Sequence, residues 1–176
     1  MRQRRRGLSS YQNQLIPGLL QTEATARALF QAHWPPPDDE TVEERVAARL
    51  ERQRLLETKS KFFNFVMEAS VLSRRVGSAE DHKEQLLHLL TVGKQRNVVV
   101  QIVPSDVVHP GLNGPFVLLE TADHDRLAYE EGQAMGALYA DPQRVSALTN
   151  RYAMILGQAL SPEESARFIS KLLEEL

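Results

Sequence analysis

A short run of β-branched residues over 98–104 restricts how this chain can fold. The run reads Val-Val-Val-Gln-Ile-Val-Pro. It is too short for a buried helix and it ends at a proline, and both features favour a buried strand. Its one polar member, Gln101, either faces solvent on an edge strand or supplies a hydrogen bond inside a pocket. The chain therefore needs a sheet that can bury this strand.

Three further runs have strand character, over 62–67, 115–120 and 127–131. Glycine and asparagine within 111–114 supply turn chemistry before the second run, and Asp-His-Asp at 123–125 supplies it between the second and the third. The last connection is short enough for a hairpin. The four runs therefore predict a small, largely antiparallel sheet of about four strands.

Helix signals surround these strands. Thr22 can cap a helix that ends near residue 32, and an aspartate before residue 40 can cap the next one. The two C-terminal helices have the clearest start signals, which are Asp141 before Pro142 and the capping box Ser161-Pro162-Glu163-Glu164. The order of elements indicates an α+β fold in which helices cover the sheet.

The length of 176 residues is that of one domain. Residues 1–14 are polar, so we expect a weakly ordered basic segment there, followed by a single domain over 15–176. Without the four arginines among the first six residues, the remainder has 17 basic and 23 acidic residues, a net charge of −6. Such a body is a poor electrostatic partner for nucleic acid.

The chain contains no cysteine, which excludes disulfides, thiolate metal sites and cysteine nucleophiles. No apolar run approaches the ~20 residues of a membrane span, and no signal-peptide core follows the basic start. These features predict a cytoplasmic protein that does not enter a membrane.

Common catalytic motifs are absent from the sequence: there is no glycine-rich phosphate loop, nucleophile elbow or dinucleotide fingerprint. His82 and His88 are six residues apart, which is the wrong spacing for two zinc ligands on one helical face. We therefore expect no metal and no cofactor.

If the chain binds a small molecule, we expect the site where the loop over 109–116 meets the sheet. That loop is long but constrained by two prolines and two glycines. Tyr129 and Glu131 alternate onto one sheet face and could line a pocket beneath it. Alternatively, helices close this face and Tyr129 is ordinary core, and His109 is a polar loop residue. The ligand-binding candidates are Glu68, Gln101, His109, Phe116, Tyr129 and Glu131.

Several stretches together resemble a known family. They are Leu15–Thr22, Ala26–Ala28, Arg49–Gln53, Val71-Leu72 with Arg74–Gly77, Gln85–Leu90, Asn97–Pro104, His109–Gly111 with Gly114–Phe116, and Tyr129–Gly132. In this order they resemble the C-terminal regulatory domain, often called antitoxin-like, of the large actinobacterial Xre-type helix-turn-helix regulators. The resemblance covers nearly the whole chain from about residue 11. It implies a regulatory module that binds a small partner protein or a small ligand and forms a homodimer.

Two motifs in this resemblance are expected to be structural neighbours. The first is Pro17-Gly18-Leu19-Leu20-Gln21-Thr22, and the second contains Arg49, Arg52 and Gln53. The turn leaves carbonyls and two leucines that need partners, and the long polar side chains of the second motif can supply hydrogen bonds. Arg52 is expected to make buried bonds of this kind.

The chain departs from the family pattern in two respects. Only sixteen residues precede Pro17, so no helix-turn-helix reader is expected in this chain, and neither is sequence-specific DNA binding. Glu68 is displaced by one position, and Glu130 stands where the family usually has an apolar residue. Carboxylates near the sheet favour a second interpretation, in which a stand-alone copy has become a small enzyme of specialised metabolism.

Overall fold

The computed structural model describes residues 6–132 and 135–176, and these residues form one mixed sheet of six strands in the order β3-β2-β1-β4-β5-β6. The strands are β1 (Arg6–Gln12), β2 (Lys61–Glu68), β3 (Val98–Val103), β4 (Phe116–Glu120), β5 (Arg126–Glu130) and β6 (Ala137–Tyr139). β1, β2 and β3 are parallel, whereas β4, β5 and β6 pair antiparallel. The α+β class is confirmed, but the prediction of four largely antiparallel strands is inexact.

The central strand β1 lies in the segment for which the sequence predicted weak order. It pairs with β2 on one side and with β4 on the other. Its sequence, RGLSSYQ, gives little apolar signal, yet Ser10 and Gln12 are buried and bonded to each other through their side chains. The strand is stabilised by its two neighbours, so composition could not reveal it. Residues 6–12 are therefore part of the domain.

The helices begin where the capping residues predicted. The longer ones are α1 (Glu23–Gln31), α2 (Asp39–Gln53), α4 (Ala79–Val92), α5 (Pro142–Leu156) and α6 (Pro162–Glu174). In each, the N-cap side chain accepts a backbone hydrogen bond; these caps are Thr22, Asp38, Ser78, Asp141 and Ser161. The short elements are η1 (Gly18–Leu20), η2 (Arg54–Glu57), α3 (Ala69–Ser73) and η3 (Pro110–Asn113).

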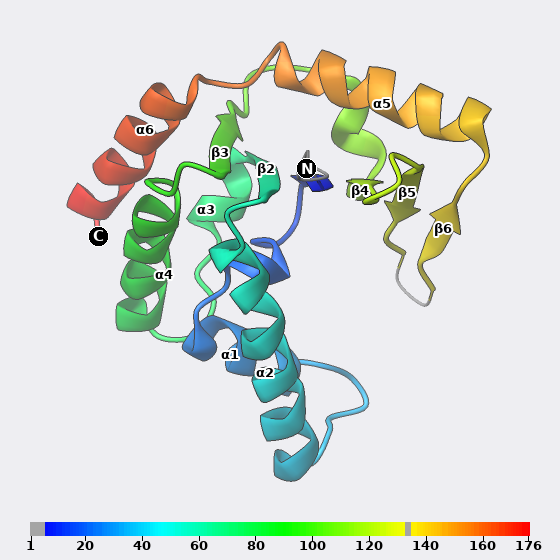
Figure 1. Cartoon of the computed structure of the whole chain (residues 1–176). Helices are drawn as coiled ribbons and strands as arrows, with labels where there is room; N and C mark the ends of the chain where they lie inside the picture. Colours follow the sequence, from blue (N-terminus) through cyan, green and yellow to red (C-terminus); the bar gives the residue numbers. More distant parts are fainter. Residues whose placement is uncertain (1–5, 133–134) are drawn as a thin grey trace.

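The sheet has a separate core on each face. On one face Phe65, Met67 and Ile102 pack with apolar residues of α3, α4 and α6. On the other face Val66 and Phe116 pack beneath α5. Figure 1 shows α5 running across one side of the sheet, with α1, α2 and α4 on the opposite side.

The β3 edge is closed by the start of α6. The Ile102 N–H donates to Ser165 Oγ at 3.0 Å, and the Leu160 N–H donates to the Ile102 carbonyl at 2.8 Å. The Gln101 side chain donates to the Leu160 carbonyl at 2.9 Å. Gln101 thus helps to cover an edge strand, which protects the edge from pairing with another chain.

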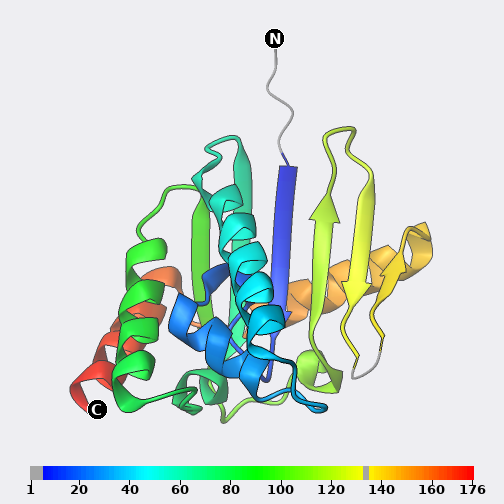
Figure 2. The ribbon, with the colours of Figure 1, turned by 90° about the horizontal axis from the view of Figure 1, so that it is seen from below.

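Helices cover only part of the sheet face that lies opposite α5. In Figure 2, α1 and α2 lie in front of the β2 region and α4 lies beside β3, whereas no long helix lies in front of β4, β5 and β6. α5 lies behind the latter strands. In the part of the chain that the structure describes, no helix has the length and apolar character needed to span a membrane.

Candidate functional site

Three polar side chains meet where the parallel strands end. Tyr11 comes from β1, Glu68 is the last residue of β2, and His109 lies in the loop after β3. The Tyr11 hydroxyl donates to Glu68 Oε1 at 2.8 Å, and His109 Nε2 lies 2.5 Å from the same oxygen. The side chains of His109 and Glu68 are 1% and 8% exposed. We call these three residues the buried cluster.

The hydrogen bonds assign the tautomer of His109. Its Nδ1 atom accepts a hydrogen bond from the Gly111 N–H at 3.1 Å, so this nitrogen carries no proton. The proton of the neutral ring then lies on Nε2 and is donated to Glu68. Burial, together with the Glu68 carboxylate, raises the pKa of the Tyr11 hydroxyl. Glu68 Oε1 therefore accepts from two donors.

Gly111 lies between the Tyr11 ring of the buried cluster and Ile155 of α5. A Cβ atom at this position would lie 2.7 Å from Tyr11 Cε1 and 2.7 Å from Ile155 Cδ1 of α5. Real side chains do not approach so closely, so only glycine lets η3 fit between the Tyr11 ring and α5. Pro110 provides the first residue of η3. The His-Pro-Gly sequence is thus explained by packing.

The buried cluster joins β1, β2 and the loop after β3 through hydrogen bonds to one carboxylate. A carboxylate beside an imidazole is also the arrangement of many acid–base pairs. Here, however, Tyr11 is 0% exposed and both ring nitrogens of His109 are bonded within the fold. In this conformation the pair is not open to a substrate, and its direct effect is to stabilise the fold.

The predicted ligand-binding residues divide between the two sheet faces. Phe116 lies with Glu68 and His109, and its ring is 5.9 Å from that of Tyr11. In the β4–β5 register, however, Phe116 pairs with Glu130, so Tyr129 and Glu131 alternate onto the opposite face. The predicted sharing of one face by Tyr129 and Glu131 is consistent with this register. The structure does not bring these two residues beneath the His109 loop.

The Tyr129 hydroxyl lies against the backbone at Gly136. A Cβ atom at Gly136 would overlap the Tyr129 hydroxyl oxygen. The chain around Gly136 therefore passes directly over this hydroxyl. Glu131 is exposed. These two residues do not form the wall of a pocket with His109.

The two family motifs are neighbours, as predicted. Arg49 Nη1 donates to Gln21 Oε1 at 2.6 Å, and Gln53 Nε2 donates to the carbonyls of Gly18 at 2.9 Å and Gln21 at 2.6 Å. The Arg49 guanidinium also lies 4.3 Å from the centre of the Phe30 ring. Arg52 was expected to share this role, but its side chain points to solvent. Arg49 and Gln53 are four residues apart and face the turn, whereas Arg52 lies farther around α2 on its exposed side.

Gln85 is a structural part of this turn whose role the sequence did not predict. Its side chain is 1% exposed on α4, where it accepts from the Thr22 N–H and donates to the Leu20 carbonyl, both at 2.8 Å. A glutamine beside Leu86 on an apolar helix face was the available signal. For Tyr11, the other missed residue, the surrounding polar sequence gave none.

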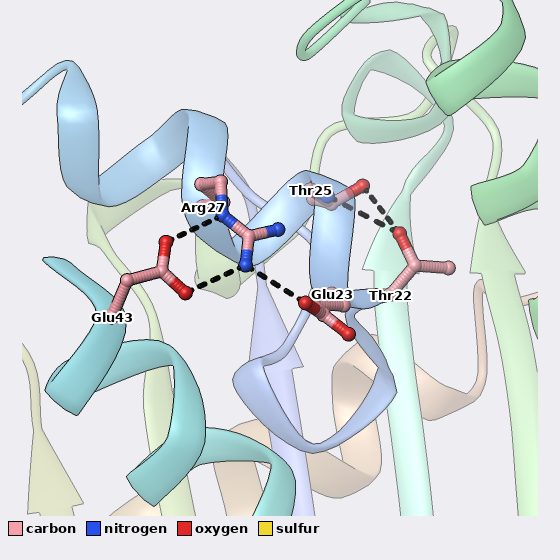
Figure 3. A network of polar contacts seen from close by, with 5 residues as sticks. All are labelled: Thr22, Glu23, Thr25, Arg27 and Glu43. Atoms are coloured by element: carbon pink, nitrogen blue, oxygen red, sulfur yellow. Dashed lines mark hydrogen bonds and ion pairs between the residues drawn. The ribbon is translucent and has the colours of Figure 1, made fainter.

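Figure 3 shows how α1 is attached to α2. The Arg27 guanidinium donates to both oxygens of Glu43 and to Glu23, each at 2.8 Å. These bonds raise the pKa of Arg27 and lower that of Glu43. Beside them, Thr22 Oγ1 accepts from the Thr25 N–H and caps α1. The Glu43 flank of α2 therefore faces α1.

Comparison with known proteins identifies one family. A family model described as "Domain of unknown function (DUF5753)" matches residues 3–171. No curated protein and no solved structure matches the chain.

Proposed function

The chain belongs to the DUF5753 family, and we propose that it is a non-enzymatic regulatory module that binds a partner protein. The observation that carries this proposal is the closed state of the buried cluster. Glu68 and His109 are the sequence-predicted residues that come together: Glu68 Oε1 accepts from Tyr11 and His109, and both ring nitrogens of His109 are bonded within the fold. A protein that binds a partner needs a stable scaffold of this kind. It does not require any ligand to reach the buried cluster.

Resemblance to the regulatory domains of Xre-type regulators supports the same function. The motifs that carry the resemblance have structural roles here: the Pro17–Thr22 turn is held by Arg49, Gln53 and Gln85. The residues that carry the resemblance therefore stabilise the scaffold of the domain. In such regulators this scaffold would present a surface to a partner, and self-association would double the number of surfaces.

A small enzyme of specialised metabolism remains the second candidate, because a carboxylate and an imidazole do lie in contact. For that function the His109 loop would have to open, and His109 would have to break its bond from Gly111 before Nδ1 could accept a proton. The binding proposal requires neither change.

Affinity capture followed by reconstitution tests the proposal. The tagged chain is used to capture proteins from an extract of its source cells, with an unrelated α+β protein as control. Each captured protein is then purified separately and titrated into the chain in a calorimeter. We expect saturable binding with a fixed stoichiometry. If no purified candidate binds, the proposal fails.

A further inference from the structure

An apolar surface lies on the side of the sheet that faces away from α5. In the register, Val117 pairs with Tyr129, Leu119 with Leu127, and Tyr129 with Leu138, so these side chains alternate onto the same face. We call this surface the half-sheet patch; it consists of Val117, Leu119, Leu127, Tyr129 and Leu138.

Among the described residues, no long helix covers the half-sheet patch, and within it only the Tyr129 hydroxyl lies under backbone, at Gly136. Figure 2 shows β4, β5 and β6 without a long helix in front of them, whereas α1 and α2 lie in front of the β2 region. Leu138 is 63% exposed, and the other four residues of the patch are partly exposed. A contiguous apolar surface of this kind on a protein marks an interaction site.

The adjoining flank of α2 is positively charged. Glu43 faces α1, and at 3.6 residues per turn Arg45 and Arg52 lie on the opposite flank of the helix. Both arginines are exposed. Between the two flanks, Arg49 interacts electrostatically with Glu131, which directly follows β5. The arginine flank is therefore on the side of α2 next to the uncovered strands.

The connection between α1 and α2 adds an exposed aromatic residue. Trp34 is 89% exposed and is the only tryptophan in the chain. Figures 1 and 2 agree that this connection extends to the β4–β6 side of α2. Tryptophan and arginine are the residue types that most often dominate the energy of protein interfaces.

We infer that the half-sheet patch, together with Arg45, Arg52 and Trp34, docks an amphipathic helix of a partner protein that carries acidic residues beside its apolar face. This inference rests on the proposed function and names its surface and the chemistry of its partner. The apolar stripe of the helix lies on the strands, and its acidic flank faces α2.

Dimensions and charge together select this occupant. Three adjacent strands span about 10 Å between the outer two, which matches the ~10 Å diameter of one helix. The strand β6 has only three residues, so the edge beyond the patch offers little backbone for pairing with an added strand. Two exposed arginines on one side favour carboxylates on the corresponding side of the partner.

Synthetic peptides test the inference without knowledge of the natural partner. The probe is a helical peptide of about four turns with leucines at i, i+3, i+4 and i+7 and glutamates along one flank. A matched peptide carries lysines in place of the glutamates. Trp34 emission reports binding directly, because no other tryptophan contributes.

We expect the glutamate peptide to bind, to shift Trp34 emission to the blue, and to bind about tenfold more tightly than the lysine peptide. The double variant Arg45→Glu/Arg52→Glu should reverse this preference, and Leu138→Asp should abolish binding of both. Arg74→Glu/Arg75→Glu is the matched control, since both arginines are exposed at the end of α3, and it should bind as the wild type does.

Equal affinity for the two peptides, no binding of either, or unchanged binding by the Leu138→Asp variant would overturn the inference. Sedimentation velocity tests whether a second copy of the chain occupies the patch instead of a partner helix. A dimer that Leu138→Asp dissociates would show that the patch is a self-association surface, and it would overturn the inference. A purified natural partner that binds the wild type and these variants equally would leave the proposed function in place and refute only its surface.

Discussion

Glu68 and His109 lie 41 residues apart in the chain, yet His109 Nε2 is 2.5 Å from Glu68 Oε1 in the interior. Tyr11 contributes the second bond to the same oxygen. A buried carboxylate is tolerated only when its bonds are made, since an unpaired one is strongly destabilising. The stability of the domain should therefore depend on each donor.

Removal of the Tyr11 hydroxyl tests one of these donors. Tyr11→Phe keeps the ring but leaves Glu68 with one bond fewer, so we expect the free energy of unfolding in urea to fall by about 1–3 kcal/mol. Tyr152→Phe is the matched control, because the buried Tyr152 hydroxyl lies near Ser9 without hydrogen-bond geometry. It should change stability by less than about 0.5 kcal/mol. Equal effects of the two substitutions would contradict the role of the cluster.

Gly111→Ala tests the close approach of η3 to Tyr11 and Ile155. The added methyl group has no room, so we expect a loss of about 1–3 kcal/mol in unfolding free energy. Gly7→Ala provides the control within a strand, since no atom lies within 4 Å of the added Cβ. It should be neutral or slightly stabilising. A stable Gly111→Ala protein would show that the loop can move away from β1 at no cost.

Gln53→Ala should destabilise the turn over 17–22, because it leaves the carbonyls of Gly18 and Gln21 without their partner. We expect a loss of about 1–3 kcal/mol by urea denaturation. Arg52→Ala, one residue away and exposed, should be neutral within about 0.5 kcal/mol. If Arg52→Ala were the more damaging change, the side-chain assignment at this turn would be wrong.

The two buried tyrosines predict a loss of stability at alkaline pH. Burial raises the pKa of Tyr152 to about 12, and it also raises that of Tyr11. Because the folded pKa lies above the unfolded value of 10.0, their contribution is complete below pH 10 and is lost as the pH rises. Each tyrosine should cost about 1.4 kcal/mol per pH unit in this range. Urea denaturation from pH 9 to 11 measures it, and each Tyr→Phe variant should have a shallower slope; identical slopes would contradict the assignment.

The sequence predicted the elements whose signals are local. The strand over 98–103 has an apolar run, and α5 and α6 have capping residues that determine where they begin. β1 could not be predicted, because Gly7, Ser9 and Ser10 carry no strand signal and the strand is stabilised by β2 and β4. β6 is only three residues long.

The candidate site was predicted in part for a similar reason. Glu68 and His109 were both singled out, but their contact depends on where the loop after β3 crosses the sheet, and local sequence does not encode that path. Alternation put Tyr129 and Glu131 on one face, and the β4–β5 register is consistent with this. Alternation does not indicate which sheet face the loop over 109–116 covers. The prediction therefore put Tyr129 and Glu131 in the same pocket as His109, although they lie on the other face.

A measurement of turnover tests the central claim, that the chain binds and does not catalyse, most directly. The purified chain is incubated with the small-molecule fraction of its source cells, and products are followed over time by mass spectrometry. Our account predicts that no compound is converted beyond one equivalent of the chain and that Glu68→Gln gives the same profile. Accumulation of a product over many equivalents, lost in a folded Glu68→Gln variant, would contradict it.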